Sequence, residues 1–185
     1  MGEKSPTFNQ KLLNDIFTMC VICYKPKGVE MPDLATLRMM YRKNHDGMGF
    51  CTPKRTYKTM DFHKFITELA KVGDEPVVMH FRWATHGSVK KSNCHPFCKG
   101  GVKFAHNGVL PIPSVNDMTD SQICFESVVY PAIKLNGWRS EKADSIIKKA
   151  ACGSRFAIMK GDDVELFGRW TDVDGLFFSN LNWCY

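Results

Sequence analysis

The first segment of the chain has apolar side chains at helical spacing. In residues 6–17 they fall near one face of a helix, at Phe8, Leu12, Leu13, Ile16 and Phe17. Ser5 precedes this segment and is a residue type that caps helices. After residue 19 the pattern changes to compact apolar runs. The sequence therefore predicts an amphipathic leader over residues 1–19 and one globular domain over residues 20–185.

Within the domain, short apolar runs of strand length are mixed with helical patterns. Strands are expected at residues 20–24, from Gly47 onward, and at 76–83, 102–105, 155–160 and 164–168. The last two are expected to form a hairpin, with the turn at residues 160–163. Helices are expected at residues 32–42, 61–72 with Asp61 as the cap, 120–136 and 140–151. Strands and helices come in blocks and not in strict alternation, which favours a layered α+β fold.

Composition narrows the class of protein. The 185 residues are 44% apolar and 24% charged, as in globular domains and unlike disordered chains. No apolar run reaches the length of a membrane helix, and the N-terminus lacks the apolar core of a secretory signal, so we expect a cytoplasmic protein with reduced thiols. The net charge of +6 comes from scattered Lys and Arg, which indicates a solvated surface and no nucleic-acid groove.

Residues able to carry chemistry gather where predicted strands begin or end. They lie in four segments, Cys20, His80–Gly87, Asn93–Phe97 and Ala105–Gly108. A strand that ends in charged or amide side chains followed by glycine places those groups at one edge of a sheet, where sites are often built. The sequence therefore predicts a site that includes Cys20.

Together these segments resemble the glutaminase domain of the class II glutamine amidotransferases, which are N-terminal-nucleophile hydrolases. The family has a Cys on its first strand, followed by H-x-R-x-A-T-H-G, N-x-H-P-F, H-N-G and S-D-T-E, which correspond here to Cys20 and residues 80–87, 93–97, 106–108 and 119–122. Residues 46–49 are similar to the end of the family's R-G-x-D-G-x-G segment. The resemblance implies a four-layer αββα sandwich. The opening of the domain also resembles small stand-alone bacteriophage-encoded members.

The resemblance assigns catalytic roles to three residues. Cys20 would attack the side-chain amide of glutamine, giving a thioester, ammonia and then glutamate. Asn107 and Gly108 would donate hydrogen bonds to the oxyanion. The base would be the free α-amine of an N-terminal Cys. The resemblance implies no cofactor and no metal.

It also assigns the residues that hold the substrate. Arg82 would pair with the α-carboxylate, since a guanidinium binds a carboxylate through two hydrogen bonds. Thr85 and the backbone near His86 would add hydrogen bonds, and Asp120 would bind the α-ammonium. Trp83 would form pocket wall. Glutamine is thus the expected small-molecule partner, with an ammonia-accepting synthetase on a separate chain.

The chain departs from the family pattern at several positions. Val21 replaces a glycine, Asn44 and His45 replace the arginine that precedes Asp46, and Gln122 replaces an acidic residue. Above all, Cys20 is not residue 1, and an amide nitrogen cannot act as the base. Activity therefore requires translation to start at Met19, or residues 1–19 to be cut off as a propeptide. Alternatively the leader persists, packs on the domain and blocks the site.

Other interpretations stay open at the level of sequence. Cys20 could be an ordinary buried cysteine, and the histidines at 80, 86 and 106 could be scaffold. Zinc held by Cys20, Cys23 and the Cys94–Cys98 segment is disfavoured because residues i and i+3 of a strand point to opposite faces. Three functions remain. They are a glutaminase or amidotransferase, a catalytically inactive member of the fold that binds a protein partner such as a host enzyme or polymerase, and an amidohydrolase with a different amide substrate.

Overall fold

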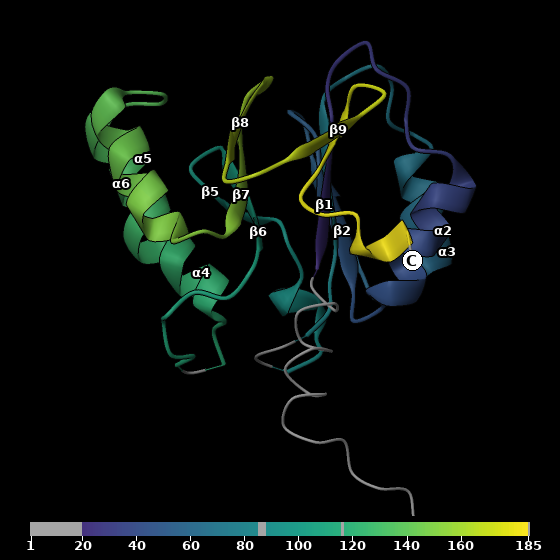
Figure 1. The fold of residues 1–185 in the computed structure, drawn as a ribbon, viewed down its shortest axis with the longest axis horizontal. Helices are drawn as coiled ribbons and strands as arrows, with labels where there is room; N and C mark the ends of the chain where they lie inside the picture. The colour runs from purple at the N-terminus through teal and green to yellow at the C-terminus, as the bar shows by residue number, and fades with distance from the viewer. Residues whose placement is uncertain (1–19, 85–87, 116, 185) are drawn as a thin grey trace, which may run out of the picture.

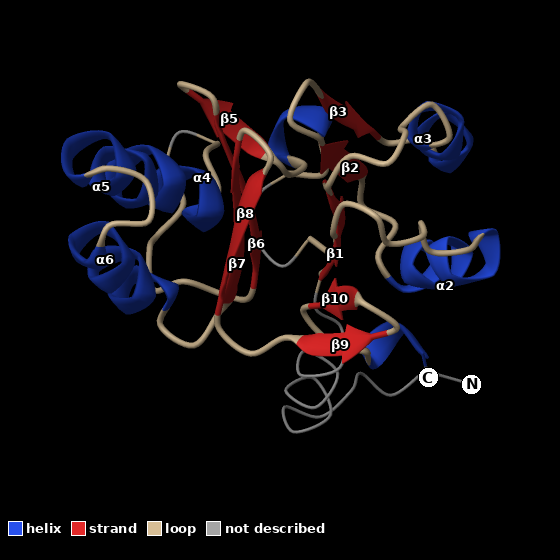
Figure 2. Cartoon of the chain, turned by 90° about the horizontal axis from the view of Figure 1, so that it is seen from above, coloured by secondary structure: helices blue, strands red, loops and turns tan. Residues whose placement is uncertain are grey.

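Two antiparallel β-sheets face each other, and helices cover the outer side of each sheet (Figures 1 and 2). The structure, a computed structural model, describes residues 20–84, 88–115 and 117–184. The predicted α+β class and four-layer αββα sandwich are confirmed. The predicted leader helix in residues 1–19 lies outside the described residues.

The first sheet has six strands and contains the strand that follows Cys20. Its order is β3-β2-β4-β1-β10-β9, with β1 at Val21–Lys25, β2 at Met48–Cys51, β3 at Thr56–Thr59, β4 at Val77–Phe81, β9 at Thr171–Val173 and β10 at Leu176–Phe178. β1 is an interior strand, with Ile22 opposite His80 of β4 and Cys23 opposite Phe178 of β10. Both neighbours therefore fix the position of Cys20.

The second sheet has four strands. Its order is β5-β6-β7-β8, with β5 at Phe97–Lys99, β6 at Val102–Asn107, β7 at Arg155–Lys160 and β8 at Asp163–Phe167. β7 and β8 form the predicted hairpin, in which Lys160 pairs with Asp163. β6 is longer than predicted and ends at Asn107, because its pairing with β7 continues until Asn107 lies opposite Arg155.

Helices cover both sheets, and side-chain caps set where most of them begin. α2 (Leu34–Lys43) and α3 (Phe62–Leu69) lie against the first sheet, and α4 (Asp120–Cys124), the π-helical turn Phe125–Val129, α5 (Tyr130–Asn136) and α6 (Glu141–Ala151) lie against the second. As predicted, Asp61 caps α3, and its Oδ1 accepts a hydrogen bond from Lys64 N at 3.1 Å. Short 3₁₀ turns lie at Lys91–Asn93 and Asn182–Cys184. Among the described residues, no helix is long and apolar enough to cross a membrane.

Apolar side chains form three layers of core. Aromatic rings fill the layer between the first sheet and its helices, where Phe65 meets Phe50 and Phe81 at centroid distances of 5.8 and 5.1 Å. The layer between the two sheets contains smaller side chains, including Ala105 and Ala157. Small residues there let the sheets approach closely, and this brings the edges of β1, β4 and β6 together.

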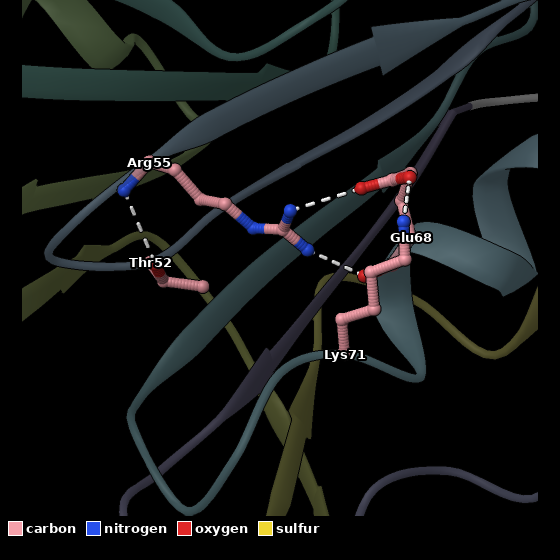
Figure 3. A network of polar contacts seen from close by, with 4 residues as sticks. All are labelled: Thr52, Arg55, Glu68 and Lys71. Carbon is pink, nitrogen blue, oxygen red and sulfur yellow. Dashed lines mark hydrogen bonds and ion pairs between the residues drawn. The ribbon is translucent and has the colours of Figure 1, made fainter.

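A polar network attaches α3 to the β2–β3 hairpin (Figure 3). The Arg55 guanidinium donates to Glu68 Oε2 at 2.9 Å and to the Glu68 carbonyl oxygen, while Lys71 pairs with the same carboxylate. The Arg55 backbone N–H also lies 3.3 Å from Thr52 Oγ1, which accepts from it. These contacts hold the helix against the sheet on the face away from the second sheet.

Candidate active site

Residues far apart in the sequence line one cavity at the edge between the two sheets. Its walls are Cys20, Arg82, Trp83, Ala84, Asn93, His95, His106, Gly108, Thr119, Asp120 and Ser121. Five of the residues with a predicted catalytic or substrate-binding role therefore line this cavity: Cys20, Arg82, Trp83, Gly108 and Asp120. The cavity has a volume of about 30 Å³, which is room for water.

The Cys20 thiol is held by one residue of the loop after β4. Its Sγ accepts a hydrogen bond from Trp83 N and donates to Trp83 O, each at 3.3 Å. The Cys20 carbonyl oxygen accepts from Asn180 Nδ2 at 2.8 Å. Burial raises the pKa of the Cys20 thiol to about 11. In this state the thiol is protonated at neutral pH and needs a base before it can act as a nucleophile.

Asn107 lies at the end of β6 and contacts Ser179, a residue that belongs to none of the sequence motifs. Its Nδ2 donates to Ser179 Oγ at 2.8 Å, and the same Oγ accepts from Ile22 N at 2.8 Å. An amide NH₂ has two hydrogens, so this contact leaves one for an oxyanion. Ser179 thus couples Asn107 to β1, directly after Cys20. Local sequence does not mark Ser179, because only the pairing of β10 with β1 brings it to the site.

Gly108 is required by its surroundings. Its φ is +143°, and a Cβ there would overlap with the Ser154 side chain. Only glycine fits this backbone. The glycine therefore permits the main chain to turn beside the cavity that Cys20 also lines.

Opposite charges come from two different layers of the sandwich. Arg82 follows β4 and is 4% exposed, and its Nη1 donates to Ser88 O at 3.2 Å. Asp120 begins α4 and is 8% exposed, and its Oδ2 accepts from Leu110 N at 2.9 Å. A buried cation and a buried anion that line one cavity suit a ligand that carries both charges.

Asp46 and Gly47 hold the main chain beside Arg82. Asp46 N donates to Arg82 O, and Arg82 N donates to Gly47 O, both at 2.9 Å. The Asp46 carboxylate accepts from Ala84 N at 2.8 Å. The short Asp46–Gly49 motif therefore shapes the Arg82 loop, and in this structure its carboxylate binds the main chain.

Three buried histidines lie together, and two of them, His95 and His106, line the cavity. The ring centroids of His80 and His95 are 4.3 Å apart, and His106 Nδ1 lies 2.7 Å from Ser121 Oγ. Burial lowers the pKa of His80 to about 3 and that of His106 to about 4, and it holds the pKa of His95 well below the usual range. All three are neutral at pH 7.

The remaining predicted site residues and the zinc alternative are placed as follows. Thr85 and His86 lie outside the described residues. Cys23 is buried in the core on the helix side of the first sheet. Within residues 20–84, 88–115 and 117–184, no group of three or more His, Cys, Asp or Glu side chains is arranged to hold a metal ion.

Comparison with known proteins gives short matches. No protein-family model matches the chain. The glutamine–fructose-6-phosphate aminotransferase (isomerizing) of Francisella tularensis is 33% identical over 78 residues, which are 42% of this chain and 12% of that protein. The enzyme of the same name from Xanthomonas campestris is 52% identical over 31 residues, which are 17% of this chain and 5% of that protein. The one from Vibrio cholerae is 40% identical over 43 residues, which are 23% of this chain and 7% of that protein.

The matched segments are thus a small part of each relative's length. They agree with the sandwich fold. Together these findings support the relationship of this chain to the class II glutamine amidotransferases.

Proposed function

We propose that this chain is a glutaminase of the class II amidotransferase type, with Cys20 as its nucleophile. The observation that carries the proposal is the meeting of Cys20, Arg82, Gly108 and Asp120 around one cavity. The partial matches to proteins whose names include glutamine as a substrate support the same chemistry.

Activation of the thiol depends on cleavage of the peptide bond between Met19 and Cys20. With a pKa of about 11, the thiol keeps its proton, and the amide nitrogen between Met19 and Cys20 cannot accept it. Removal of residues 1–19 creates an α-amine with a pKa of about 7.7 to 8.0, which is able to take the proton directly or through water. We therefore assign residues 1–19 to a propeptide and residues 20–185 to the catalytic domain.

The reaction then uses Cys20 and Gly108, which line the cavity, together with Asn107, which precedes Gly108 in the chain. The Cys20 thiolate adds to the glutamine side-chain carbonyl, and the second Nδ2 hydrogen of Asn107 and the backbone N–H of Gly108 stabilise the oxyanion. The C–N bond breaks, and the nitrogen leaves as ammonia with the proton that the α-amine took from the thiol. Water then attacks the γ-glutamyl thioester, which releases glutamate and regenerates the thiol.

Substrate recognition uses the opposite charges of Arg82 and Asp120. Arg82 binds the α-carboxylate of glutamine and Asp120 its α-ammonium, while Trp83 forms wall beside Cys20. We assign Thr85 and His86 further hydrogen bonds to the carboxylate. We place the activity in the cytoplasm, which is the host cytoplasm for a bacteriophage-encoded chain.

A direct experiment compares two forms of the protein. A chain beginning at Cys20, made by cutting a removable tag, should release ammonia from glutamine, whereas the full chain and Cys20→Ser should not. Asparagine and simple amides, tested in parallel, separate a glutaminase from an amidohydrolase of other specificity. A folded chain with a free Cys20 amine that neither releases ammonia nor forms a covalent adduct with a glutamine-like electrophile would overturn the proposal.

The state of Cys20 in the uncut chain favours a second candidate, a catalytically inactive protein that binds a partner. The protonated thiol and the small cavity both belong to a chain that retains Met19. Intact-mass measurement on protein from its natural source discriminates between the two. A species that begins at Cys20 supports the glutaminase, and full-length chain alone supports the binding protein.

A further inference from the structure

A second, larger cavity lies away from Cys20. It is a groove of about 750 Å³ between the loop before α2, the β9–β10 hairpin and the 3₁₀ turn at Asn182–Cys184. Its floor is mostly apolar and includes Met31, Leu176 and Trp183. This volume is in the range of sites that hold a ligand or a peptide segment.

The charge of the groove is opposite to that of the whole chain. Glu30, Asp33 and Asp174 line it, and no Lys, Arg or His is among the described residues that do so. The protein as a whole carries a net charge of +6. An apolar floor with an acidic rim fits an amphipathic segment that also carries lysine.

The leader joins the domain next to this groove. The Cys20 carbonyl oxygen accepts a hydrogen bond from Asn180 Nδ2 at 2.8 Å. Leu181, which directly follows Asn180, and Cys184 form part of the groove wall. A helix over residues 6–17 would be about 18 Å long, and residues 18 and 19 would connect it to Cys20. The leader therefore starts beside the groove and is long enough to lie along it.

We propose that residues 6–17 bind in this groove as an amphipathic helix. Phe8, Leu12 and Ile16 would lie on the apolar floor, and Lys11, on the flank of the same helix, would face the carboxylates. The bound leader holds the Met19–Cys20 peptide bond at the start of β1. Binding of the leader does not depend on the glutamine chemistry, so the two proposals are tested separately.

Cysteine cross-linking tests the position of the leader. Cys184 is an exposed thiol in the groove, whereas Cys98 and Cys152 are exposed elsewhere. In full-length Ile16→Cys, mild oxidation should link residue 16 to Cys184 within one chain, as read by peptide mass spectrometry. In the control Asn14→Cys the new thiol points about 200° away around the helix, and the yield should be several-fold lower.

Charge reversal tests the acidic rim. Glu30→Lys should lower the yield of the Ile16→Cys cross-link several-fold, while Asp162→Lys, in the exposed turn between β7 and β8, should leave it unchanged. Equal linkage to Cys98, Cys152 and Cys184, or equal yields for the two leader positions, would overturn the proposal. A cross-link found only in covalent dimers would overturn it too, because it would place the leader on a second copy.

Discussion

His80 Nε2 lies 3.2 Å from the carbonyl oxygen of His106, and this contact joins the two sheets. His80 belongs to β4 in the first sheet, whereas His106 belongs to β6 in the second. Because a carbonyl oxygen only accepts, the neutral His80 ring carries its proton on Nε2. The contact lies one residue before Asn107, so it fixes the spacing of the sheets where the active-site cavity begins.

Loss of the hydrogen bond between His80 and the His106 carbonyl oxygen should destabilise the fold. His80→Phe keeps an aromatic ring but removes the donor, so we expect the free energy of unfolding to fall by about 1 kcal/mol or more. Urea unfolding followed by circular dichroism measures it. His63→Phe, at an exposed position on α3, is the control and should change stability by less than about 0.5 kcal/mol. Equal effects of the two substitutions would contradict the structural role of His80.

Stability should fall steeply in mild acid. Burial lowers the pKa values of His80, His95 and His106, so the unfolded chain binds protons below about pH 6.5 that the folded chain does not. The contribution of the neutral histidines to the free energy of unfolding is fully present above that pH. It is lost as the pH falls toward the pKa values of the folded chain, about 4 for His106 and about 3 for His80. Urea unfolding at pH 7, 6 and 5 should show a loss of several kcal/mol.

The slope of that pH dependence identifies its source. Each buried histidine contributes up to about 1.4 kcal/mol per pH unit. His95→Asn should therefore reduce the slope by about that amount, whatever its effect on stability at pH 7. An unchanged slope would show that His95 does not contribute.

Gly49 should not tolerate a side chain. A Cβ at this position would overlap with the His95 carbonyl oxygen and lie 2.8 Å from that of Tyr57. Both are backbone atoms, so we expect Gly49→Ala to cost about 3 kcal/mol. Gly73→Ala is the matched control, because nothing lies within 4 Å of its Cβ, and it should be neutral. Thermal unfolding of both variants checks the difference, and a neutral Gly49→Ala would disprove the close approach.

Cys20 should react slowly while the leader is attached. Its pKa of about 11 leaves little thiolate at pH 7.5, so iodoacetamide should modify the exposed Cys98, Cys152 and Cys184 first. In a chain that begins at Cys20, the adjacent amine should accelerate alkylation of this thiol. Peptide mass mapping over time measures both rates. Fast modification of Cys20 in the full chain would contradict the protonated state.

Kinetics of the chain that begins at Cys20 should separate binding from catalysis. Arg82→Ala removes the proposed partner of the glutamine carboxylate and should mainly raise KM. Asn107→Ala removes the proposed oxyanion donor and should lower kcat by about 100- to 1000-fold with a smaller effect on KM. Steady-state ammonia release measures both, with circular dichroism as the check on folding. Normal constants in both variants would reject these assignments.

The sequence predicts those parts of the structure that depend on local pattern. The cap at Asp61 and the β7–β8 hairpin follow from it because turns and amphipathic helices are encoded within a few residues. The order of the motifs along the chain likewise predicts that Cys20 and Arg82 share a site, and both residues line the same cavity.

The parts that the sequence does not predict depend on contacts between distant segments. β9 and β10 have three residues each, too few to show a period of two, and all three residues of β9 are exposed. Ser179 contacts Ile22 across 157 residues of sequence. The groove beside Trp183 likewise comes from three separate segments, so no local pattern reveals it.

The pairing of β1 with β10 also has a consequence for synthesis of the protein. Cys20 emerges from the ribosome early, but Ser179 and Asn180, which bind Ile22 and the Cys20 carbonyl oxygen, are translated about 160 residues later. Until then β1 has an open edge, and long-range pairing of this kind forms slowly. Cys20 therefore reaches its final position only after about 160 further residues have been translated.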